Sequence, residues 1–215
     1  MKEKFNTFIF DLDGTLVNTS PGFRHAILGQ TLGELGVPVP EDRIIDDFWY
    51  GEGRDQLIRS YFGLDPQKFW AVYSRYDTVE LRKQFTEPYS DVDIIKELKE
   101  RGYKVGIVTS AAQHIIALET GMIGRGNFDE IVSLNFGQGI PPKPDPRGLE
   151  ICLSRLKSRK EEAIYGGNAS EDVRMAQNAH VFDVFVDRRE HEFPGLNPSL
   201  TIYSLYELRQ FYDGA

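Results

Sequence analysis

Residues 5–16 of the chain are FNTFIFDLDGTL. The run from Phe5 to Phe10 is mostly apolar and predicts a buried strand that ends at Asp11. Asp11 and Asp13 then follow, and two unpaired carboxylates cannot face an apolar core because their desolvation costs too much. The pair is therefore either a polar exit from the strand or a set of oxygen ligands for a hard cation.

The rest of the chain divides into a helical block and an alternating block. Residues 20–86 are predicted to be mostly helix, with breaks at proline and glycine and no convincing strand. After Pro88, apolar strands alternate with helices, which predicts βαβ units around a parallel sheet. The expected strands are 103–108, 130–134, 163–165, 181–186 and 199–203. The helical block interrupts this alternation and is expected to be an inserted, all-helical cap domain at residues 19–87, with the α/β core at residues 1–18 and 88–215.

Local end signals predict the helices of the core. Ser90 is expected to cap a helix over Val92–Arg101, and Asp145 to cap one that begins at Pro146. Further helices are expected over residues 111–121 and 171–179 and at the C-terminus.

Parallel sheets bind ligands beyond the carboxyl ends of their strands. Polar residues follow three of the predicted strands, and we expect them to converge on one site. They are Asp11 and Asp13, then Thr109 and Ser110, then Asn168 and Asp172.

Composition narrows the choice of partners. The chain has 215 residues and a net charge of −8 without a run of Lys and Arg, which argues against nucleic acid and anionic membrane surfaces. No stretch approaches the roughly 20 apolar residues of a membrane span. The single cysteine, Cys152, lies in an apolar helical stripe and is expected to pack in the core. A single cysteine cannot form an intrachain disulfide, which predicts a cytoplasmic protein. The oligomeric state, monomer or homodimer, is left open by the sequence.

Residues 8–16, FIFDLDGTL, resemble the first motif of the haloacid dehalogenase superfamily. The helical insertion resembles the branch that contains phosphoglycolate phosphatases and β-phosphoglucomutases. The resemblance implies a doubly wound, Rossmann-like core with a cap and a Mg²⁺ cofactor. It also implies that Asp11 is the nucleophile that forms an aspartyl phosphate and that Asp13 is the general acid and base. The dehalogenases of the family lack the second aspartate, so Asp13 indicates phosphoryl chemistry.

Two further motifs fit the same family. Val105–Ser110, VGIVTS, resembles the second motif, in which Thr109 would donate its hydroxyl to a phosphoryl oxygen; a helix cap is the alternative. PPKPDP at residues 141–146 resembles the Lys-Pro-x-Pro loop, in which Lys143 would neutralise the nucleophile and the phosphoryl group. The alternative for Lys143 is a rigid surface turn with a solvated lysine. Gly14, Thr15 and Ser110 are expected to bind the substrate.

The fourth motif departs from the family pattern. Residues 166–172 are GGNASED, which puts Asn168 where the family has an aspartate that binds the metal. Asp172, or Glu171 by a local shift, would compensate for the missing charge. The alternative is that these acids only form the first turn of the next helix. The predicted metal ligands are Asp11, Asp13, Asn168 and Asp172.

The cap offers one candidate contact. Residues 51–54, GEGR, match the spacing of a cap loop in the β-phosphoglucomutases, so Arg54 is expected to bind the substrate unless it is a surface arginine. The histidine expected of a mutase would fall near Phe23, which favours hydrolysis. The sequence thus predicts a Mg²⁺-dependent phosphatase acting on a phosphoglycolate-like or sugar phosphate. The alternatives are a phosphomutase or phosphotransferase, and a regulatory binding protein with a weakened metal site.

Overall fold

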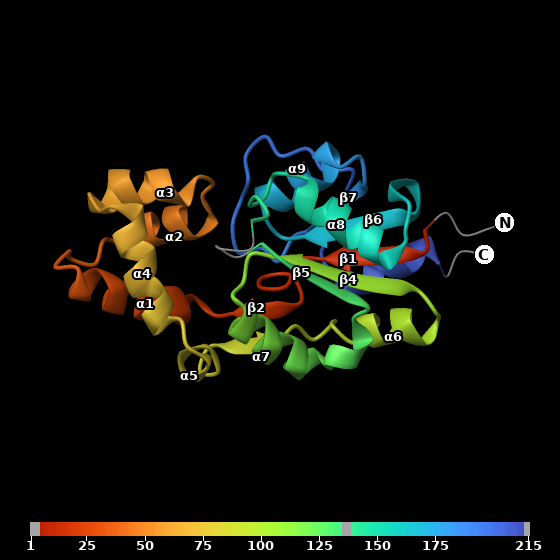
Figure 1. Cartoon of the computed structure of the whole chain (residues 1–215), viewed down its shortest axis with the longest axis horizontal. Coiled ribbons are helices and arrows are strands. Elements are labelled where there is room, and N and C mark those ends of the chain that lie inside the picture. The colour runs from red at the N-terminus through yellow and green to blue at the C-terminus, as the bar shows by residue number, and fades with distance from the viewer. Residues whose placement is uncertain (1–4, 135–138, 213–215) are drawn as a thin grey trace. The chain divides into compact units, whose positions relative to one another are not determined.

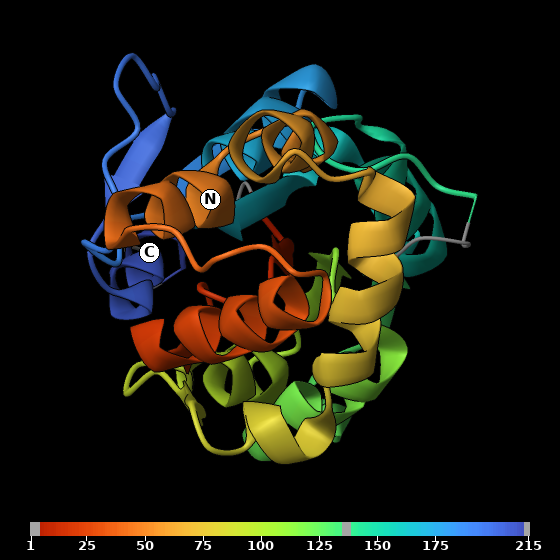
Figure 2. The same cartoon turned by 90° about the vertical axis from the view of Figure 1, so that its left-hand side faces the viewer.

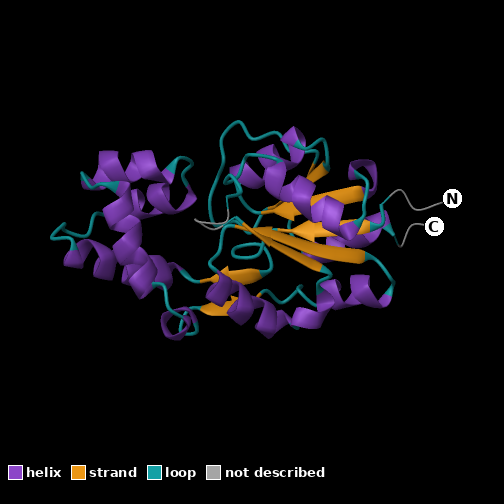
Figure 3. Ribbon diagram, in the orientation of Figure 1, coloured by secondary structure: helices purple, strands orange, loops and turns teal. Residues whose placement is uncertain are grey.

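The computed structural model describes residues 5–134 and 139–212 (Figures 1 and 3). The chain forms two compact units. One unit ends at Asn18 and resumes at Glu87, and the other is Thr19–Thr86.

The first unit is built on a six-stranded sheet with the order β5-β4-β1-β6-β7-β8, in which each neighbouring pair is parallel. The strands are β1 (Thr7–Phe10), β4 (Lys104–Thr109), β5 (Glu130–Ser133), β6 (Ala163–Gly167), β7 (Phe182–Val186) and β8 (Leu200–Ile202). The parallel α/β sheet predicted from the sequence is confirmed. Its strand β1 is central, so the residues that follow it lie between the ends of β4 and β6.

Helices cover both faces of this sheet. On one face lie α6 (Ile94–Glu100), α7 (Gln113–Ile123) and the 3₁₀-helix η4 (Leu205–Phe211); on the other lie α8 (Arg147–Leu156) and α9 (Ser170–Asn178). Alternate side chains of β1 account for this, because Phe8 and Phe10 pack in the first layer and Ile9 in the second. Cys152 is fully buried in the second layer, which confirms its predicted core position. Short 3₁₀ turns lie at η2 (Arg125–Asn127) and η3 (Lys160–Glu162).

The second unit is helical, as predicted. It contains α1 (Pro21–Glu34), α2 (Asp42–Tyr50), α3 (Arg54–Leu57), the π-helix η1 (Ile58–Phe62), α4 (Pro66–Tyr76) and α5 (Val79–Arg82). Helices α1 and α4 cross and pack against each other (Figure 2). The core of this unit is an aromatic cluster of Phe48, Phe62 and Phe69 with aliphatic neighbours. Where the chain passes between the units, β2 (Val17–Thr19) pairs with β3 (Thr86–Pro88).

Two predicted helix starts are wrong. Helix α6 begins at Ile94 and not at Val92, and Ser90 is not its N-cap. Helix α8 begins at Arg147, one residue later than predicted, and Asp145 accepts hydrogen bonds from the backbone and the guanidinium of Arg147. The N-caps are Asp93 for α6 and Pro146 for α8, and Asp91, which also precedes α6, pairs with Arg188. The C-terminal helix is of the 3₁₀ type.

Among the residues described, none of the helices combines the length and apolar character that a bilayer crossing requires.

Candidate active site

Asp11 lies at the centre of the site, directly after β1. Its backbone N–H donates to the carbonyl of Gly166 on β6, at 2.9 Å, and its side chain is buried. The Lys143 ammonium donates to Asp11 Oδ1 at 2.6 Å and to Asp172 Oδ1 at 2.7 Å. Lys143 is only 6% exposed, so the alternative of a solvated surface lysine is excluded. One cation and two carboxylates leave this buried group with an excess negative charge.

The Asp172 carboxylate accepts hydrogen bonds from three donors of the protein. Besides Lys143, its Oδ1 accepts from the hydroxyl of Tyr165 at 2.9 Å, and its Oδ2 accepts from the N–H of Ala169 at 3.1 Å. A Cβ at Gly167 would collide with the Asp172 carboxylate, so only glycine permits this approach. These contacts favour a role for Asp172 in holding Lys143 over the predicted role as a direct metal ligand.

The charges shift each other's protonation. Burial raises the pKa of Asp11 to about 7; Lys143 opposes this rise, and the carboxylate of Asp172 adds to it. Burial would lower the pKa of the Lys143 ammonium, but the charges of Asp11 and Asp172 outweigh it and raise that pKa. Lys143 therefore stays charged at neutral pH, whereas the pKa of Asp11 lies close to neutrality.

A tight loop follows Asp11. The carbonyl of Leu12 accepts from the N–H groups of Thr15, Leu16 and Val17, at 3.3, 2.9 and 3.2 Å. Gly14 has a φ of +84°, and a Cβ there would collide with the side chain of Asn168. The loop turns back on itself in a way that only glycine allows.

Thr15 connects the loop to Asn168. Its buried hydroxyl lies 3.3 Å from Asp11 Oδ2 and 3.1 Å from Asn168 Oδ1. The structure thus brings together five of the predicted residues through direct contacts. They are Asp11, Thr15, Lys143, Asn168 and Asp172, with Gly14 pressed against Asn168.

The donor set at this point fits a hard cation. Within residues 5–134 and 139–212, no three or more His, Cys, Asp or Glu side chains form a metal-binding group. Mg²⁺, however, is commonly bound by one or two carboxylates, with waters and substrate phosphate oxygens completing its octahedron. The carboxylate of Asp11, the amide oxygen of Asn168 and the half-buried Asp13 supply oxygen ligands of that kind. The excess negative charge around Lys143 agrees with a cation.

Thr109, Ser110 and Arg54 were also predicted to bind the substrate, and they lie at the following places. Thr109 ends β4, and its buried hydroxyl oxygen accepts from the N–H of Ala111 at 3.2 Å. The N-cap of α7 is Ala112, so the helix-cap alternative for Thr109 is excluded. Ser110 is exposed at the end of the same strand. Arg54 begins α3 in the other unit, is exposed, and donates to the carbonyl of Trp49 at 3.0 Å.

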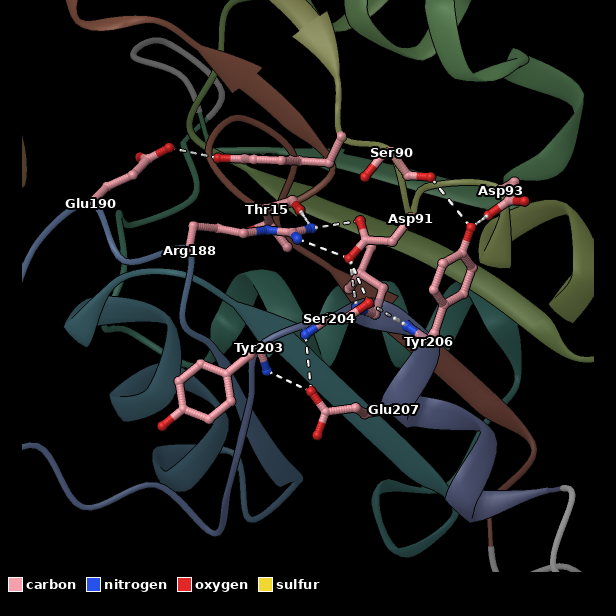
Figure 4. Close-up of polar contacts among 12 residues, drawn as sticks. Thr15, Ser90, Asp91, Asp93, Arg188, Glu190, Tyr203, Ser204, Tyr206 and Glu207 are labelled. Atoms are coloured by element: carbon pink, nitrogen blue, oxygen red, sulfur yellow. Dashed lines mark hydrogen bonds and ion pairs between the residues drawn. The ribbon is translucent and has the colours of Figure 1, made fainter.

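Two contributors were missed from the sequence. Tyr165 was assigned only to an apolar strand, although its hydroxyl binds Asp172. Arg188 donates to the backbone carbonyl of Thr15 at 2.6 Å and pairs with Asp91 (Figure 4). Arg188 is the second residue after β7, so extending the strand-end rule to that strand would have found it.

Known proteins resemble the chain in sequence over most of its length. A family model described as haloacid dehalogenase-like hydrolase matches residues 8–186. A pyrophosphatase PpaX of Bacillus cereus (strain Q1) is 30% identical over 180 residues, which cover 82% of this chain and 80% of that protein. The pyrophosphatase PpaX of Halalkalibacterium halodurans is 31% identical over 187 residues, which cover 83% of this chain and 81% of that protein.

Solved structures share the fold. A structure described as a haloacid dehalogenase-like hydrolase of Bacteroides fragilis matches with a TM-score of 0.82 and 24% identity, over 95% of this chain and 100% of that one. A predicted phosphoglycolate phosphatase from Haemophilus somnus matches with a TM-score of 0.78 and 19% identity, over 98% of this chain and 99% of that one. At these identities the likeness establishes the architecture and not the substrate.

Proposed function

The chain belongs to the haloacid dehalogenase-like hydrolases, and on that premise we propose that it is a Mg²⁺-dependent phosphatase that hydrolyses a small phosphate ester through Asp11. The contact between Lys143 and Asp11, at 2.6 Å, is the observation that carries the proposal. A buried carboxylate at the end of the central strand, held by a buried ammonium, is oriented for attack on phosphorus. The ammonium also neutralises charge on the phosphoryl oxygens.

The proposed reaction has two displacements. In the first, a carboxylate oxygen of Asp11 attacks phosphorus, the bond from phosphorus to the ester oxygen breaks, and Asp13 protonates the leaving oxygen. In the second, water attacks phosphorus, Asp13 takes a proton from that water, and the bond from phosphorus to Asp11 breaks. The products are the alcohol and inorganic phosphate.

Other residues of the chain bind and orient in this scheme. Thr109 and Ser110 donate hydroxyls to phosphoryl oxygens, and Arg54 binds an anionic or hydroxylated leaving group. Asp11, the backbone carbonyl of Asp13 and Asn168 would hold Mg²⁺, which when bound neutralises phosphoryl charge. Asp172 and Tyr165 keep the Lys143 ammonium in place.

Two substrate classes follow from the relatives. A phosphoglycolate-like or sugar phosphate agrees with the helical insertion and with the name of the Haemophilus somnus neighbour. Pyrophosphate is the second candidate, because the Bacillus cereus and Halalkalibacterium halodurans relatives carry that activity in their names and match about four-fifths of their own length. With pyrophosphate the same two displacements break the bond from phosphorus to the bridging oxygen, and the leaving group is a second phosphate in place of an alcohol. Phosphoryl transfer in place of hydrolysis requires that water be excluded from the phosphorylated Asp11.

The decisive experiment measures phosphate release from an aryl phosphate with Mg²⁺, with a chelator, and with the Asp11→Asn variant. We expect turnover that needs Mg²⁺ and that falls by at least about 10³-fold in the variant, because the nucleophile is lost. A panel of 2-phosphoglycolate, sugar phosphates and pyrophosphate then ranks the substrate classes, and product analysis separates phosphate release from an isomerised phosphate ester.

Turnover that persists in Asp11→Asn would show that Asp11 is not the nucleophile. No turnover of any of these compounds in Mg²⁺, Mn²⁺ or Co²⁺ would favour the regulatory alternative, in which Asn168 weakens the metal site.

A further inference from the structure

A second buried cation touches the loop that carries Asp11. Arg188 and Asp91 form an ion pair in which each side chain is only 7% exposed. Arg188 Nη1 donates to Asp91 Oδ2 at 2.9 Å, and Nη2 donates to Asp91 Oδ1 at 3.1 Å (Figure 4). This fork-to-fork geometry fixes the plane of the guanidinium.

The same guanidinium holds the backbone of the loop. Arg188 Nη2 donates to the carbonyl of Thr15 at 2.6 Å. The ring of Tyr89 stacks on the guanidinium at 3.8 Å, and the N–H of Tyr89 donates to the carbonyl of Leu16 at 3.1 Å. Two consecutive carbonyls of the loop are therefore bound by one group, which we call the Arg188 bracket: Tyr89, Asp91 and Arg188.

The bracket is itself anchored from the C-terminal part of the chain. Asp91 Oδ2 accepts from the hydroxyl of Ser204 at 3.0 Å and from the N–H of Leu205 at 2.8 Å. The Tyr89 hydroxyl donates to Glu190 at 2.7 Å. Segments far apart in sequence thus converge on it (Figure 4), which makes a fixed support for the loop and not a loose surface pair.

Thr15, whose carbonyl Arg188 binds, also contacts Asp11. The carbonyl of Thr15 is bound by Arg188, while its hydroxyl lies 3.3 Å from Asp11 Oδ2 and 3.1 Å from Asn168 Oδ1. A shift of the Thr15 peptide therefore moves a donor that contacts the reacting carboxylate. We propose that Arg188, held by Asp91 and Tyr89, is a positioning residue that sets the Asp11 carboxylate through Thr15.

The inference rests on the proposed function, since it assigns Arg188 a part in the same reaction. Arginine suits the role because its planar fork can bind two carboxylate oxygens and a backbone carbonyl at once, which a lysine cannot do in this geometry. The competing interpretation is an ion pair that only stabilises the fold. The two interpretations differ in one respect: only positioning predicts that removal of Arg188 lowers kcat through the Thr15 hydroxyl.

The test is a double-mutant cycle on steady-state kinetics with Arg188→Met and Thr15→Val. Arg188→Met alone is expected to lower kcat about tenfold to 100-fold with little change in KM, because small misplacements of a reacting group have effects of that size. Once Thr15→Val has removed the hydroxyl, adding Arg188→Met is expected to lower kcat by less than about threefold, since the two changes act on one contact.

Asp183→Asn is the matched control. Asp183 is a buried carboxylate of the same unit that accepts from the backbone N–H and the hydroxyl of Ser199, at 2.8 and 2.6 Å, as Asp91 accepts from Leu205 and Ser204. It is expected to lower the melting temperature and to leave kcat within about twofold of wild type. If Arg188→Met does not fold, Asp91→Asn takes its place in the cycle, because it keeps the arginine and weakens the fork.

Wild-type kcat in both Arg188→Met and Asp91→Asn, or losses that multiply fully in the Thr15→Val background, would overturn the proposal. If the wild-type protein turns over no phosphate compound, the proposed function fails separately. Amide hydrogen exchange over residues 12–17 then tests whether Arg188 holds the loop in position. Faster exchange in Arg188→Met than in Asp183→Asn supports the proposal, and equal exchange in the two variants refutes it.

Discussion

Two buried cations contact the loop after β1, and their surroundings differ in charge. Lys143 lies against two carboxylates, Asp11 and Asp172, at 2.6 and 2.7 Å. Arg188 lies against one carboxylate, Asp91, and a neutral backbone carbonyl. The lysine group therefore carries an excess negative charge, whereas the arginine group is balanced.

This difference separates a reactive site from a support. Burial with a second carboxylate nearby raises the pKa of Asp11 to about 7. Burial acts in the same direction on Asp91, but hydrogen bonds from Arg188, Leu205 and Ser204 outweigh it and lower the pKa of that carboxyl. The excess negative charge beside Lys143 can be neutralised by a metal cation. The charge of Arg188 is matched by the carboxylate of Asp91 without a metal ion.

Replacing Lys143 is expected to give the largest effect in a test of the difference between the Lys143 and Arg188 groups. Lys143→Met is expected to lower kcat by about 10²- to 10³-fold, because a preorganised charge at the reacting group is lost. That loss should exceed the loss in Arg188→Met, which only displaces the loop. The measurement is phosphate release from an aryl phosphate at saturating Mg²⁺.

Lys99→Met provides the matched control, since Lys99 also donates to a carboxylate, Asp129, at 2.6 Å in the same unit. Its kcat should stay near that of wild type. If Lys143→Met retained more activity than Arg188→Met, the assignment of the two cations would have to be exchanged.

The two groups also differ in how far the sequence revealed them. Asp11 and Lys143 stand in short motifs, and the strand-end rule placed Asp11 at the correct edge of a parallel sheet, so local pattern was sufficient. Asp91 and Arg188 are 97 residues apart and belong to no motif. Their pairing depends on how β7 and the segment before α6 pack, which no local pattern contains.

The error in the predicted start of α6 also comes from a contact between distant residues. Ser90 and Asp91 precede an apolar helical stretch, and a side chain there has the same local signature whether it caps the helix or binds a distant arginine. Tyr165 is similar, because a tyrosine inside a buried strand gives no sign of where its hydroxyl lies. The helices and strands follow from the periodicity of apolar residues in the sequence. Polar contacts between residues far apart in the chain can be identified only in the folded structure.

Asn168 offers a sharper test of the charge imbalance. Asn168→Asp would add a negative charge beside the Thr15 hydroxyl, which can donate to either side chain. We expect the Mg²⁺ concentration for half-maximal activity to fall about tenfold to 100-fold, as typical of changes at metal sites. Activity titrations and calorimetry with Mg²⁺ alone measure it.

Serine at the same position is a useful companion, because Asn168→Ser shortens the side chain without adding charge and should weaken Mg²⁺ activation. Equal or weaker Mg²⁺ binding in Asn168→Asp would mean that residue 168 does not contact the metal.

The smallest expected effect concerns stability and pH, and the two carboxylates should give opposite trends. Asp11 has a folded pKa of about 7 against an ordinary value of 3.8. Between these values the unfolded chain has released a proton that the folded protein keeps, so the contribution of Asp11 to stability falls as the pH rises. The free energy of unfolding of Asp11→Asn relative to wild type should therefore increase from about pH 4 to pH 7 and then level off.

Asp91 should behave in the opposite way, because its folded pKa lies below the ordinary 3.8. Its stabilising effect is complete above that value and is lost as the pH falls through the folded pKa. Asp91→Asn should cost about 1–3 kcal/mol at pH 7, since Arg188 loses an ionised partner, and the cost should shrink in acid. Urea unfolding with a chelator from pH 3 to 8 measures both variants. Parallel curves would mean that the two carboxylates lie in equivalent electrostatic surroundings, and the distinction between a reactive group and a support would then have to rest on position alone.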